Sequence, residues 1–218
     1  MAINLLFEDP TAYFTQLVLV VFSICCHEFM HAWVALTQGD DTAARKGHLT
    51  LNPMIQMGPI SLLVAGIIGI AWGSVPTNPH LMRHKYSDAL VSLAGPAANL
   101  GLFIAFALLS AFAFQLDWGQ QVYHMFWVGT VLNVVLFLFN MLPVPPLDGS
   151  KIAEYFFPRL GALDSEMRNG AMFLLFGIAF LFFKYFWYAG LIASGFFIGV
   201  LRIVLAITHI GPMPPNYG

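Results

Sequence analysis

The sequence predicts an all-α membrane protein that crosses the bilayer several times. Of its 218 residues, 59% are hydrophobic and only 9% are charged, whereas soluble domains contain about 25% charged residues. Several apolar runs also reach the roughly 20 residues that a helix needs to span the hydrocarbon core. A soluble fold could not bury this much apolar surface, so we expect a single membrane-embedded domain covering residues 1–218.

We expect about five transmembrane helices. Four apolar runs are long enough to hold them, at about residues 13–37, 88–114, 122–142 and 171–210. The last run can hold two helices, and a turn near Lys184 to Gly190 would divide it, although the aromatic residues there also suit a membrane interface. The predicted architecture is a core at about residues 13–155 followed by two C-terminal helices.

Residues 58–73 form a shorter apolar segment between the first two predicted spans. The segment is interrupted by glycine, so we expect a re-entrant segment, possibly β, that enters and leaves the membrane on one side. Most basic residues then share one face: Arg45, Lys46, Arg83, Lys85, Lys151, Arg159 and Arg168. The positive-inside rule makes this face cytoplasmic, with the N-terminus outside, the C-terminus inside and Lys184 as an exception in an outer turn.

The polar residues exclude several classes of protein. The nine basic residues are scattered and the net charge is −2, which argues against nucleic acid as a partner. Cys25 and Cys26 are adjacent, so they provide neither a disulfide framework nor a CxxC motif. No basic residue precedes the first apolar run, unlike in a signal peptide, and we expect that helix to be retained.

The first predicted helix contains the pattern H-E-x-x-H at residues 27–31. Positions four apart lie on one face of a helix, so His27 and His31 can bind one metal ion while Glu28, offset by about one hundred degrees, lies beside it as a base. The alternative is a set of packed polar residues, which is costly within lipid. The pattern therefore predicts a catalytic metal site.

Catalytic zinc usually has three protein ligands, so a third must come from elsewhere. Asp148 is the best candidate, because it follows a segment with three prolines, residues 143–147, that cannot continue a helix. Its alternative role is an N-cap for the next helix. If residues 58–73 do not cross the membrane, the helix before Asp148 runs parallel to the helix of His27 and His31. That topology favours the ligand role.

Together these motifs resemble the site-2 protease family of intramembrane zinc metalloproteases, in its compact bacterial branch. Residues 140–149 resemble the signature NxxPxPxLDG, and residues 93–99 resemble the element LAGPxxN. Residues 52–59 depart from the NPxxHxDP of relatives, with Gln56 and Gly58 in place of the polar pair. The resemblance implies one zinc ion per chain and a transmembrane helix of another protein as substrate, cleaved as part of regulated proteolysis or clearance of signal-peptide remnants.

Asn140 and Asn99 are further candidates within the resembling motifs. A buried amide in lipid needs partners, and either residue could bind the substrate backbone or stabilise the oxyanion. For Asn99, close helix packing through its small neighbours is the alternative.

The proposed reaction is hydrolysis of a peptide bond in a locally unwound substrate helix, with an edge of residues 58–73 as a possible pairing strand. A metal carrier would not need Glu28 at this spacing, and a catalytically silent relative would not need the complete site. We expect the protein in a bacterial inner membrane, with its site toward the cytoplasm.

Overall fold

A computed structural model describes residues 2–158 and 183–208, together with a few residues between these ranges: Gly170, Leu174, Leu175, Gly177, Ile178, Phe180 and Leu181. Arg159, Arg168 and the C-terminal tail from 209 onward lie outside the described residues. All regular secondary structure within the described part is helical, which confirms the predicted all-α class.

Four helices are long and apolar enough to cross a membrane: α2 (Pro10–Thr37), α6 (Ser87–Gln115), α7 (Gln120–Asn140) and α10 (Phe183–Ile207). The other described helices are shorter: α1 (Ala2–Glu8), α3 (Thr42–Arg45), α4 (Pro53–Gln56), α5 (Gly58–Ile68), the 3-10 helix η1 (Pro79–Leu81) and α8 (Asp148–Phe156). The protein is thus an integral membrane protein with four described spans.

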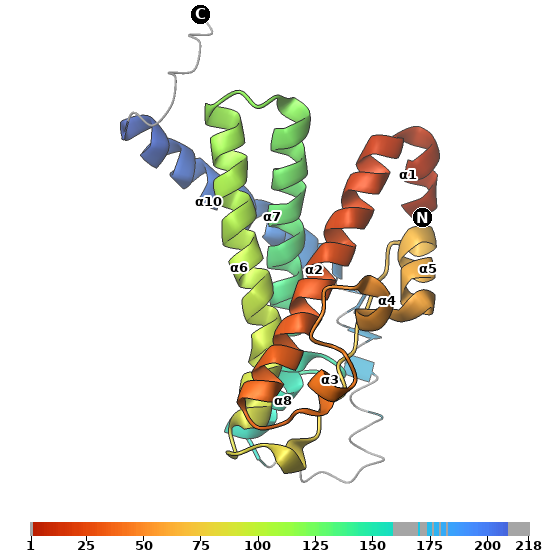
Figure 1. Cartoon of the computed structure of the whole chain (residues 1–218). Helices are drawn as coiled ribbons and strands as arrows, with labels where there is room; N and C mark the ends of the chain where they lie inside the picture. The colour runs from red at the N-terminus through yellow and green to blue at the C-terminus, as the bar shows by residue number, and fades with distance from the viewer. Residues whose placement is uncertain are drawn as a thin grey trace, which may run out of the picture.

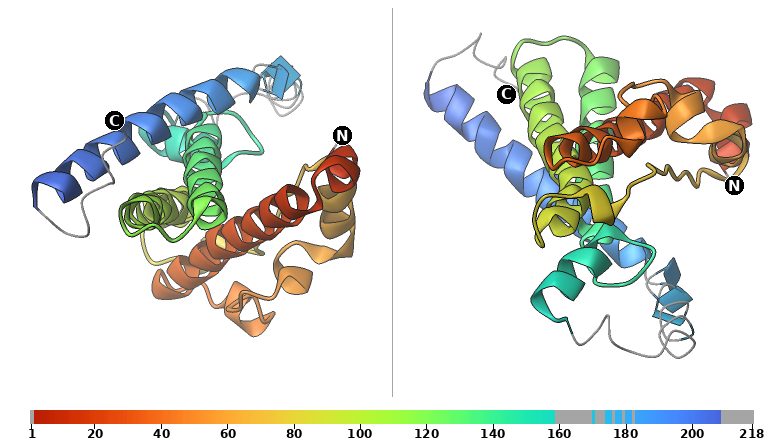
Figure 2. Two further views of the ribbon diagram at one scale, coloured as in Figure 1. Left: turned by 90° about the horizontal axis from the view of Figure 1, so that it is seen from above. Right: turned by 60° about the horizontal axis from the view of Figure 1, so that its bottom comes forward.

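The four long helices form a bundle with α6 and α7 between α2 and α10 (Figures 1 and 2). Helices α2 and α7 descend in Figure 1, while α6 ascends beside α7, so α2 and α7 run in the same direction as predicted. Helix α8 and the loop that follows α2 lie at the lower end. This arrangement brings the end of α7 close to the second half of α2.

The C-terminal region differs from the prediction. Helix α10 is continuous from Phe183 to Ile207, so the turn predicted near Lys184 to Gly190 is wrong. Gly190 packs against α7 instead, where an added Cβ would lie 2.5 Å from a methyl of Val135. The glycine therefore permits close helix packing and does not divide the run.

The direction of α10 also differs from the prediction. Phe183 contacts Phe139 near the lower end of α7, whereas Arg202 lies over the ring of Phe114 near the upper end of α6, 3.4 Å from its centroid. Helix α10 therefore ascends and ends at the face where α2 begins (Figure 1). The start of α2 and the end of α10 therefore lie on the same face, whereas the prediction placed the first helix start and the last helix end on opposite faces.

Residues 58–73 do not span the bilayer, as predicted, but their described structure is not β. Helix α5 occupies Gly58–Ile68 and ends at Gly69, whose positive φ of 88° suits glycine. The hydroxyl of Tyr13 donates to the Gly66 carbonyl at 2.8 Å. The chain then returns in an extended conformation, held to α5 by Ser61, whose hydroxyl bonds both backbone polar groups of Trp72.

The loops on either side of this segment meet at the lower end of the bundle. The N–H of Arg83 donates to the carbonyl of Gln38 at 2.9 Å, and the buried carboxylate of Asp40 accepts a bond from the N–H of Asn78. Burial alone would raise the pKa of Asp40, but bonds from Thr42 and Asn78 outweigh it and hold that pKa below its ordinary value. These contacts confirm that the two loops share one face.

The departure from the family pattern at residues 52–59 has a structural explanation. Gln56 is buried, and its amide donates to the carbonyls of His48 and Thr50, at 2.8 and 2.5 Å. Gln56 thus braces the loop that leads into α5.

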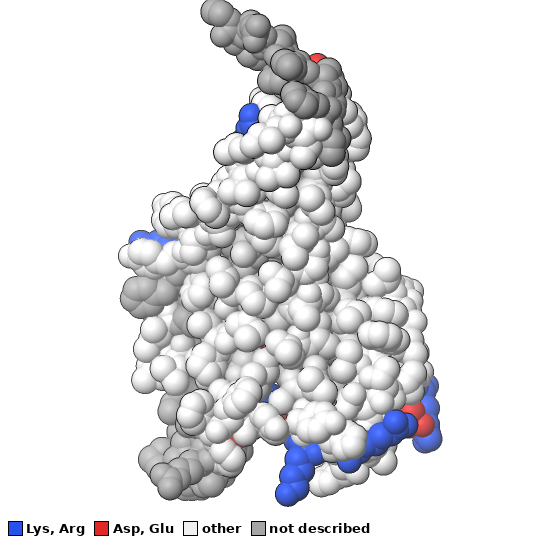
Figure 3. Space-filling view, turned by 90° about the vertical axis from the view of Figure 1, so that its left-hand side faces the viewer, with Lys and Arg blue, Asp and Glu red and all other residues white. Residues whose placement is uncertain are grey.

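The charge distribution agrees with a membrane orientation. In Figure 3 most of the Lys and Arg atoms in view gather at the lower end of the molecule, and the surface above them is largely uncharged apart from one group at the left edge and one near the top. Lys184 lies in the first turn of the continuous helix α10, beside the end of α7, so it does not lie in the predicted outer turn. Arg202 lies near the other end of α10, over the ring of Phe114.

Candidate metal centre

His27 and His31 lie one turn apart on the face of α2 that packs against α6. Both side chains are buried, and their Nε2 atoms lie 3.0 Å from each other. The spacing of four residues places the rings one above the other, as the sequence predicts. The pair lies in the second half of the span, with His31 about 9 Å from the end of α2 at the rise of 1.5 Å per residue.

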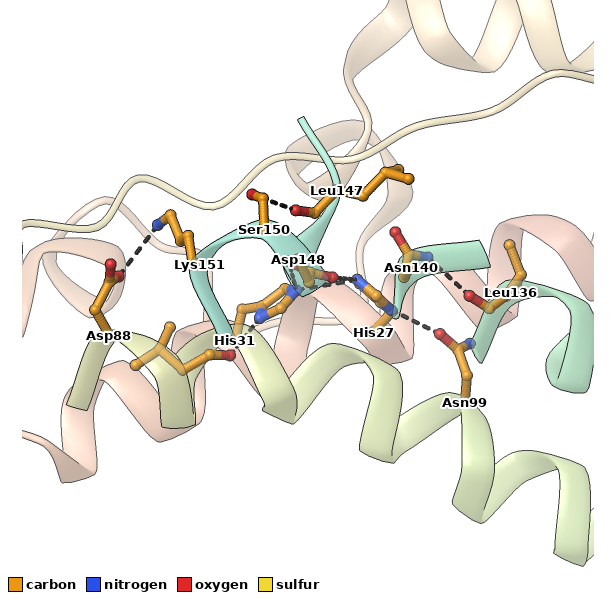
Figure 4. Close-up of polar contacts among 11 residues, drawn as sticks. His27, His31, Asp88, Asn99, Leu136, Asn140, Leu147, Asp148, Ser150 and Lys151 are labelled. Carbon is orange, nitrogen blue, oxygen red and sulfur yellow. Dashed lines mark hydrogen bonds and ion pairs between the residues drawn. The ribbon is translucent and has the colours of Figure 1, made fainter. Parts of the chain in front are cut away.

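Asp148 completes the cluster from the other side. One of its carboxylate oxygens lies 3.0 Å from Nε2 of His27 and the other 3.3 Å from Nε2 of His31 (Figure 4). Asp148 is the first residue of α8 and makes no capping bond, since Leu147 occupies the N-cap position. The N-cap alternative is therefore excluded, and the helix N-terminus favours the carboxylate charge.

Gly149 explains how α8 can fold back so tightly beneath α7. A Cβ at this position would overlap the backbone of Met141 and Leu142. Because backbone atoms cannot move aside as a flexible side chain can, only glycine permits this approach. The Asp-Gly pair thus combines a polar ligand atom with the turn that presents it.

Backbone and amide oxygens hold both histidine rings through their Nδ1 atoms. His31 Nδ1 lies 2.6 Å from the carbonyl of Val91, and His27 Nδ1 lies 2.6 Å from Oδ1 of Asn99. A carbonyl oxygen only accepts, so each Nδ1 carries the proton and each neutral ring presents a lone pair at Nε2. Lone pairs of His27, His31 and Asp148 then converge on one point. A cation bound at that point would stabilise the arrangement.

The geometry of this cluster fits a tetrahedral metal ion. Ligand atoms bound tetrahedrally at about 2.0 to 2.1 Å lie about 3.3 Å from one another. The two Nε2 atoms are 3.0 Å apart, and each lies 3.0 or 3.3 Å from a different oxygen of the Asp148 carboxylate. Gly95 of α6 leaves the necessary space, because an added Cβ would lie within 3.0 Å of both Nε2 atoms. Among the described residues, these three are the group of His, Cys, Asp and Glu side chains arranged to hold a metal.

Glu28 lies on the neighbouring face of the same helical turn and is also buried. The extended segment that follows α5 passes directly over it, because a Cβ on Gly73 would lie 2.5 Å from Oε1 of Glu28. The carboxylate is therefore next to the paired histidines and next to an extended backbone. This is the placement expected for a base that acts on a molecule held at the metal.

The two candidate asparagines occupy different environments. Asn99 is fully buried, with Oδ1 bonded to His27 and Nδ2 donating to Asn133 at 3.0 Å. It therefore supports His27 from between the helices, and its amide does not face a space for substrate as a binding or oxyanion role requires. Asn140 is half-buried at the end of α7, where it donates to the carbonyl of Leu136 at 3.0 Å.

Three residues in and around the site had escaped prediction, Asn133, Ser23 and Gly73, and Gly95 had been interpreted only as a small residue for close helix packing. Ser23 precedes His27 by one helical turn, and Asn133 is an amide within an apolar span. The rule that a buried amide needs partners applies to Asn133 as it does to Asn140. The two glycines carry no chemical signal, since their importance lies in the space that they leave.

The fold and the site define a membrane-embedded metallopeptidase. The model of peptidase family M50 matches residues 113–184. YwhC of Bacillus subtilis, named as a candidate zinc metalloprotease, is 39% identical over 149 residues, which are 64% of this chain and 67% of that protein. Rip2 of Mycolicibacterium smegmatis, similarly named, is 36% identical over 64% of this chain and 58% of its own length.

An archaeal relative extends the similarity. MJ0611 of Methanocaldococcus jannaschii, named as a candidate zinc metalloprotease, is 31% identical over 71% of this chain and 79% of its own length. No solved structure matches the chain. The chain belongs to peptidase family M50, the site-2 protease family that its motifs resemble.

Proposed function

We propose that this protein is an intramembrane zinc metalloprotease that hydrolyses peptide bonds in or near the transmembrane segments of other membrane proteins. The observation that carries this proposal is the convergence of His27, His31 and Asp148 beside Glu28 in the second half of a spanning helix. The names of the relatives, which describe zinc metalloproteases, support the same reaction.

His27, His31 and Asp148 would hold one zinc ion per chain. Three protein ligands leave the fourth position of a tetrahedral ion available, which is the pattern of catalytic zinc sites. When bound there, zinc activates water for attack and polarises the scissile carbonyl. Both histidines act as neutral ligands through Nε2, and the charge of Asp148 partly balances that of the metal.

Glu28 acts as the general base and then as the general acid. Its carboxylate accepts a proton from the attacking water, whose oxygen forms a bond to the carbonyl carbon. The proton is then delivered to the amide nitrogen as the carbon–nitrogen bond breaks, so that one water molecule is consumed for each peptide bond. We assign Asn140 to substrate backbone or oxyanion binding, since it lies half-buried where α7 leads into the segment of Asp148.

A substrate helix must unwind before attack, because its amides are bonded within the helix. We place the pairing strand in the extended segment after Gly69, since the backbone bonds of α5 are already used within that helix. This segment passes over Glu28 at Gly73. An unwound substrate could add to it as a strand and so present its backbone to the base.

We further propose a bacterial inner membrane as the location, with the metal centre toward the cytoplasm, because the basic residues gather at that end of the bundle. The substrate is the transmembrane helix of another protein. Release of a membrane-held regulator and clearance of signal-peptide remnants both fit this chemistry.

Cleavage by the purified protein tests the proposal. The protein would be reconstituted in liposomes with a peptide that contains one transmembrane helix, and the products identified by mass spectrometry. We expect cleavage that stops when a chelator removes the metal and returns when zinc is restored. Cleavage that continues in a sample shown to contain no zinc would refute it.

A further inference from the structure

A chain of buried amide contacts joins His27 to the middle of α7. Asn99 Oδ1 lies 2.6 Å from His27 Nδ1 (Figure 4), and Asn99 Nδ2 donates to Oδ1 of Asn133 at 3.0 Å. Asn133 Nδ2 in turn donates to the Gly129 carbonyl at 2.9 Å and to the Ser23 hydroxyl at 3.0 Å. Asn99, Asn133 and Ser23 are all fully buried, so water cannot replace these contacts.

One end of this chain fixes the direction of every hydrogen bond in it. The Gly129 carbonyl can only accept, so the NH₂ group of Asn133 must face it and its oxygen must face Asn99. Asn99 must then present its NH₂ group to Asn133 and its oxygen to His27. Nδ1 of His27 must therefore donate, and the unprotonated nitrogen of the neutral ring is Nε2, which faces Asp148.

We propose that Asn133 is a positioning residue for the metal centre, which sets the orientation of the Asn99 amide and through it the tautomer of His27. This inference rests on the proposed role of His27 as a ligand. Without Asn133, the Asn99 amide can rotate and present its NH₂ group to Nδ1. The proton of His27 then moves to Nε2, where it must be displaced before a metal can bind, and this weakens metal binding. His31 needs no such device, because the carbonyl of Val91 holds its Nδ1 directly.

The substitution Asn133→Leu tests this proposal, because leucine has a similar size but removes all three side-chain hydrogen bonds of Asn133, to Asn99, Ser23 and Gly129. We expect zinc affinity, measured by competition with a chelator, to fall by about 10- to 100-fold, as for other outer partners of metal ligands. Circular dichroism and gel filtration in detergent would verify folding. If folding fails, Asn133→Ser serves instead, since its hydroxyl can bond the carbonyl one turn back but cannot reach Asn99.

Two control variants test the logic of the chain. Thr130→Val removes another buried hydroxyl of α7, which donates to the Phe126 carbonyl of its own helix at 2.8 Å, and it should keep the zinc affinity of the parent. Ser23→Ala should also keep it, because the Gly129 carbonyl still orients Asn133. If Ser23→Ala lost as much zinc affinity as Asn133→Leu, the claim that the Gly129 carbonyl orients Asn133 would be refuted.

Rescue distinguishes positioning from a merely structural role. Aspartate at the Asn99 position offers only oxygens when ionised, so it must accept the Nδ1 proton of His27 whatever its rotation. We therefore expect Asn99→Asp to restore zinc affinity in the Asn133→Leu background, although it does not repair the contacts of α7 with α2. Failure of this rescue in a folded double variant would overturn the proposal.

The parent protein and His27→Ala complete the set. A parent that binds no zinc, or a His27→Ala variant that binds it as tightly as the parent, would refute the ligand assignment and with it the proposed function. A parent that binds zinc through His27 while folded Asn133→Leu binds it equally well would refute the positioning role alone.

Discussion

At the level of single residues, the site separates metal binding from proton transfer. His27, His31 and Asp148 direct their polar atoms at one point, while Glu28 lies beside them under Gly73. Because Glu28 is not one of the three residues that would hold the metal, its carboxylate can change protonation state without releasing the metal. The two functions should therefore respond differently to substitution.

We predict that Glu28→Gln retains one zinc ion per chain and loses proteolysis, since the amide keeps the shape of the side chain but cannot accept the proton. Zinc content by metal analysis and cleavage of a membrane peptide give the two readouts. Glu8→Gln, an exposed position at the end of α1, is the control and should retain both properties. Cleavage by Glu28→Gln at the rate of the parent would remove Glu28 from its assigned role.

We predict that Asp148→Asn weakens zinc binding by more than the about 10- to 100-fold expected for an outer partner, because a neutral amide replaces a charged ligand. Asp88→Asn is the matched control, since Asp88 binds Lys151 of α8 at 3.1 Å but lies outside the metal cluster. Equal zinc affinity in Asp148→Asn and the parent would show that another residue completes the site.

Sequence patterns predicted the paired histidines, and the structure shows how Asp148 meets them. A spacing of four residues on a helix is enough to place His27 and His31 on the same face. Asp148 required the topology as well, because only parallel spans bring it to the depth of the histidines. The role of Asn99 could not be predicted, since the pattern does not say whether its amide faces a substrate or the ring of His27.

At the level of elements, α6 provides the space for the metal. Gly95 lies where α6 faces the two histidines, and an added methyl group would enter the region between their Nε2 atoms. The helix gains nothing from glycine here, since glycine in a helix interior costs roughly 0.5 to 1 kcal/mol relative to alanine. The close approach to the metal ligands explains the glycine.

We predict that Gly95→Ala prevents zinc binding while the helices still form. Gly101→Ala in the same helix is the matched control, because nothing lies within 4 Å of its added Cβ. The residue after Gly95 is Pro96, whose ring disfavours a helical residue with a Cβ before it. Gly95→Ala should therefore also be made with Pro96→Ala, and zinc affinity near that of the parent in this double variant would contradict the prediction.

The elements that were predicted incorrectly share a physical cause. The glycines of residues 58–73 suggested an interrupted or β segment. The first eleven residues of that segment nevertheless form helix α5, which ends at Gly69. Gly190 and the aromatic residues near Lys184 suggested a turn, but Gly190 packs against α7. In both cases glycine permits close packing or ends a helix, and sequence alone does not distinguish these uses.

At the level of the whole molecule, the re-entrant segment determines whether the site can exist. Because residues 38–40 bind residues 78–87 at one end of the bundle, α2 and α7 run in the same direction. One more crossing would separate Asp148 from His31 by much of a roughly 30 Å hydrocarbon core. Metal bonds of about 2 Å cannot bridge that distance.

We predict that Lys46→Cys and His80→Cys are labelled from one side of the membrane, and Gln120→Cys and Thr208→Cys from the other. Each would be made in a Cys25→Ala, Cys26→Ala background and treated with a membrane-impermeant thiol reagent in oriented vesicles. All four positions are exposed. Labelling of Lys46→Cys and His80→Cys from opposite sides would contradict the topology on which the metal centre depends.

The central claim is hydrolysis of a peptide bond within a membrane-spanning substrate by Glu28 and a zinc ion. The most direct measurement is mass spectrometry of the products formed in liposomes from a single-span peptide, with ¹⁸O-labelled water in the medium. The parent should release a fragment that ends within or next to the apolar segment and carries one ¹⁸O atom at its new carboxyl terminus, and Glu28→Gln should release none. The same fragment from zinc-bound Glu28→Gln at the rate of the parent would contradict the account.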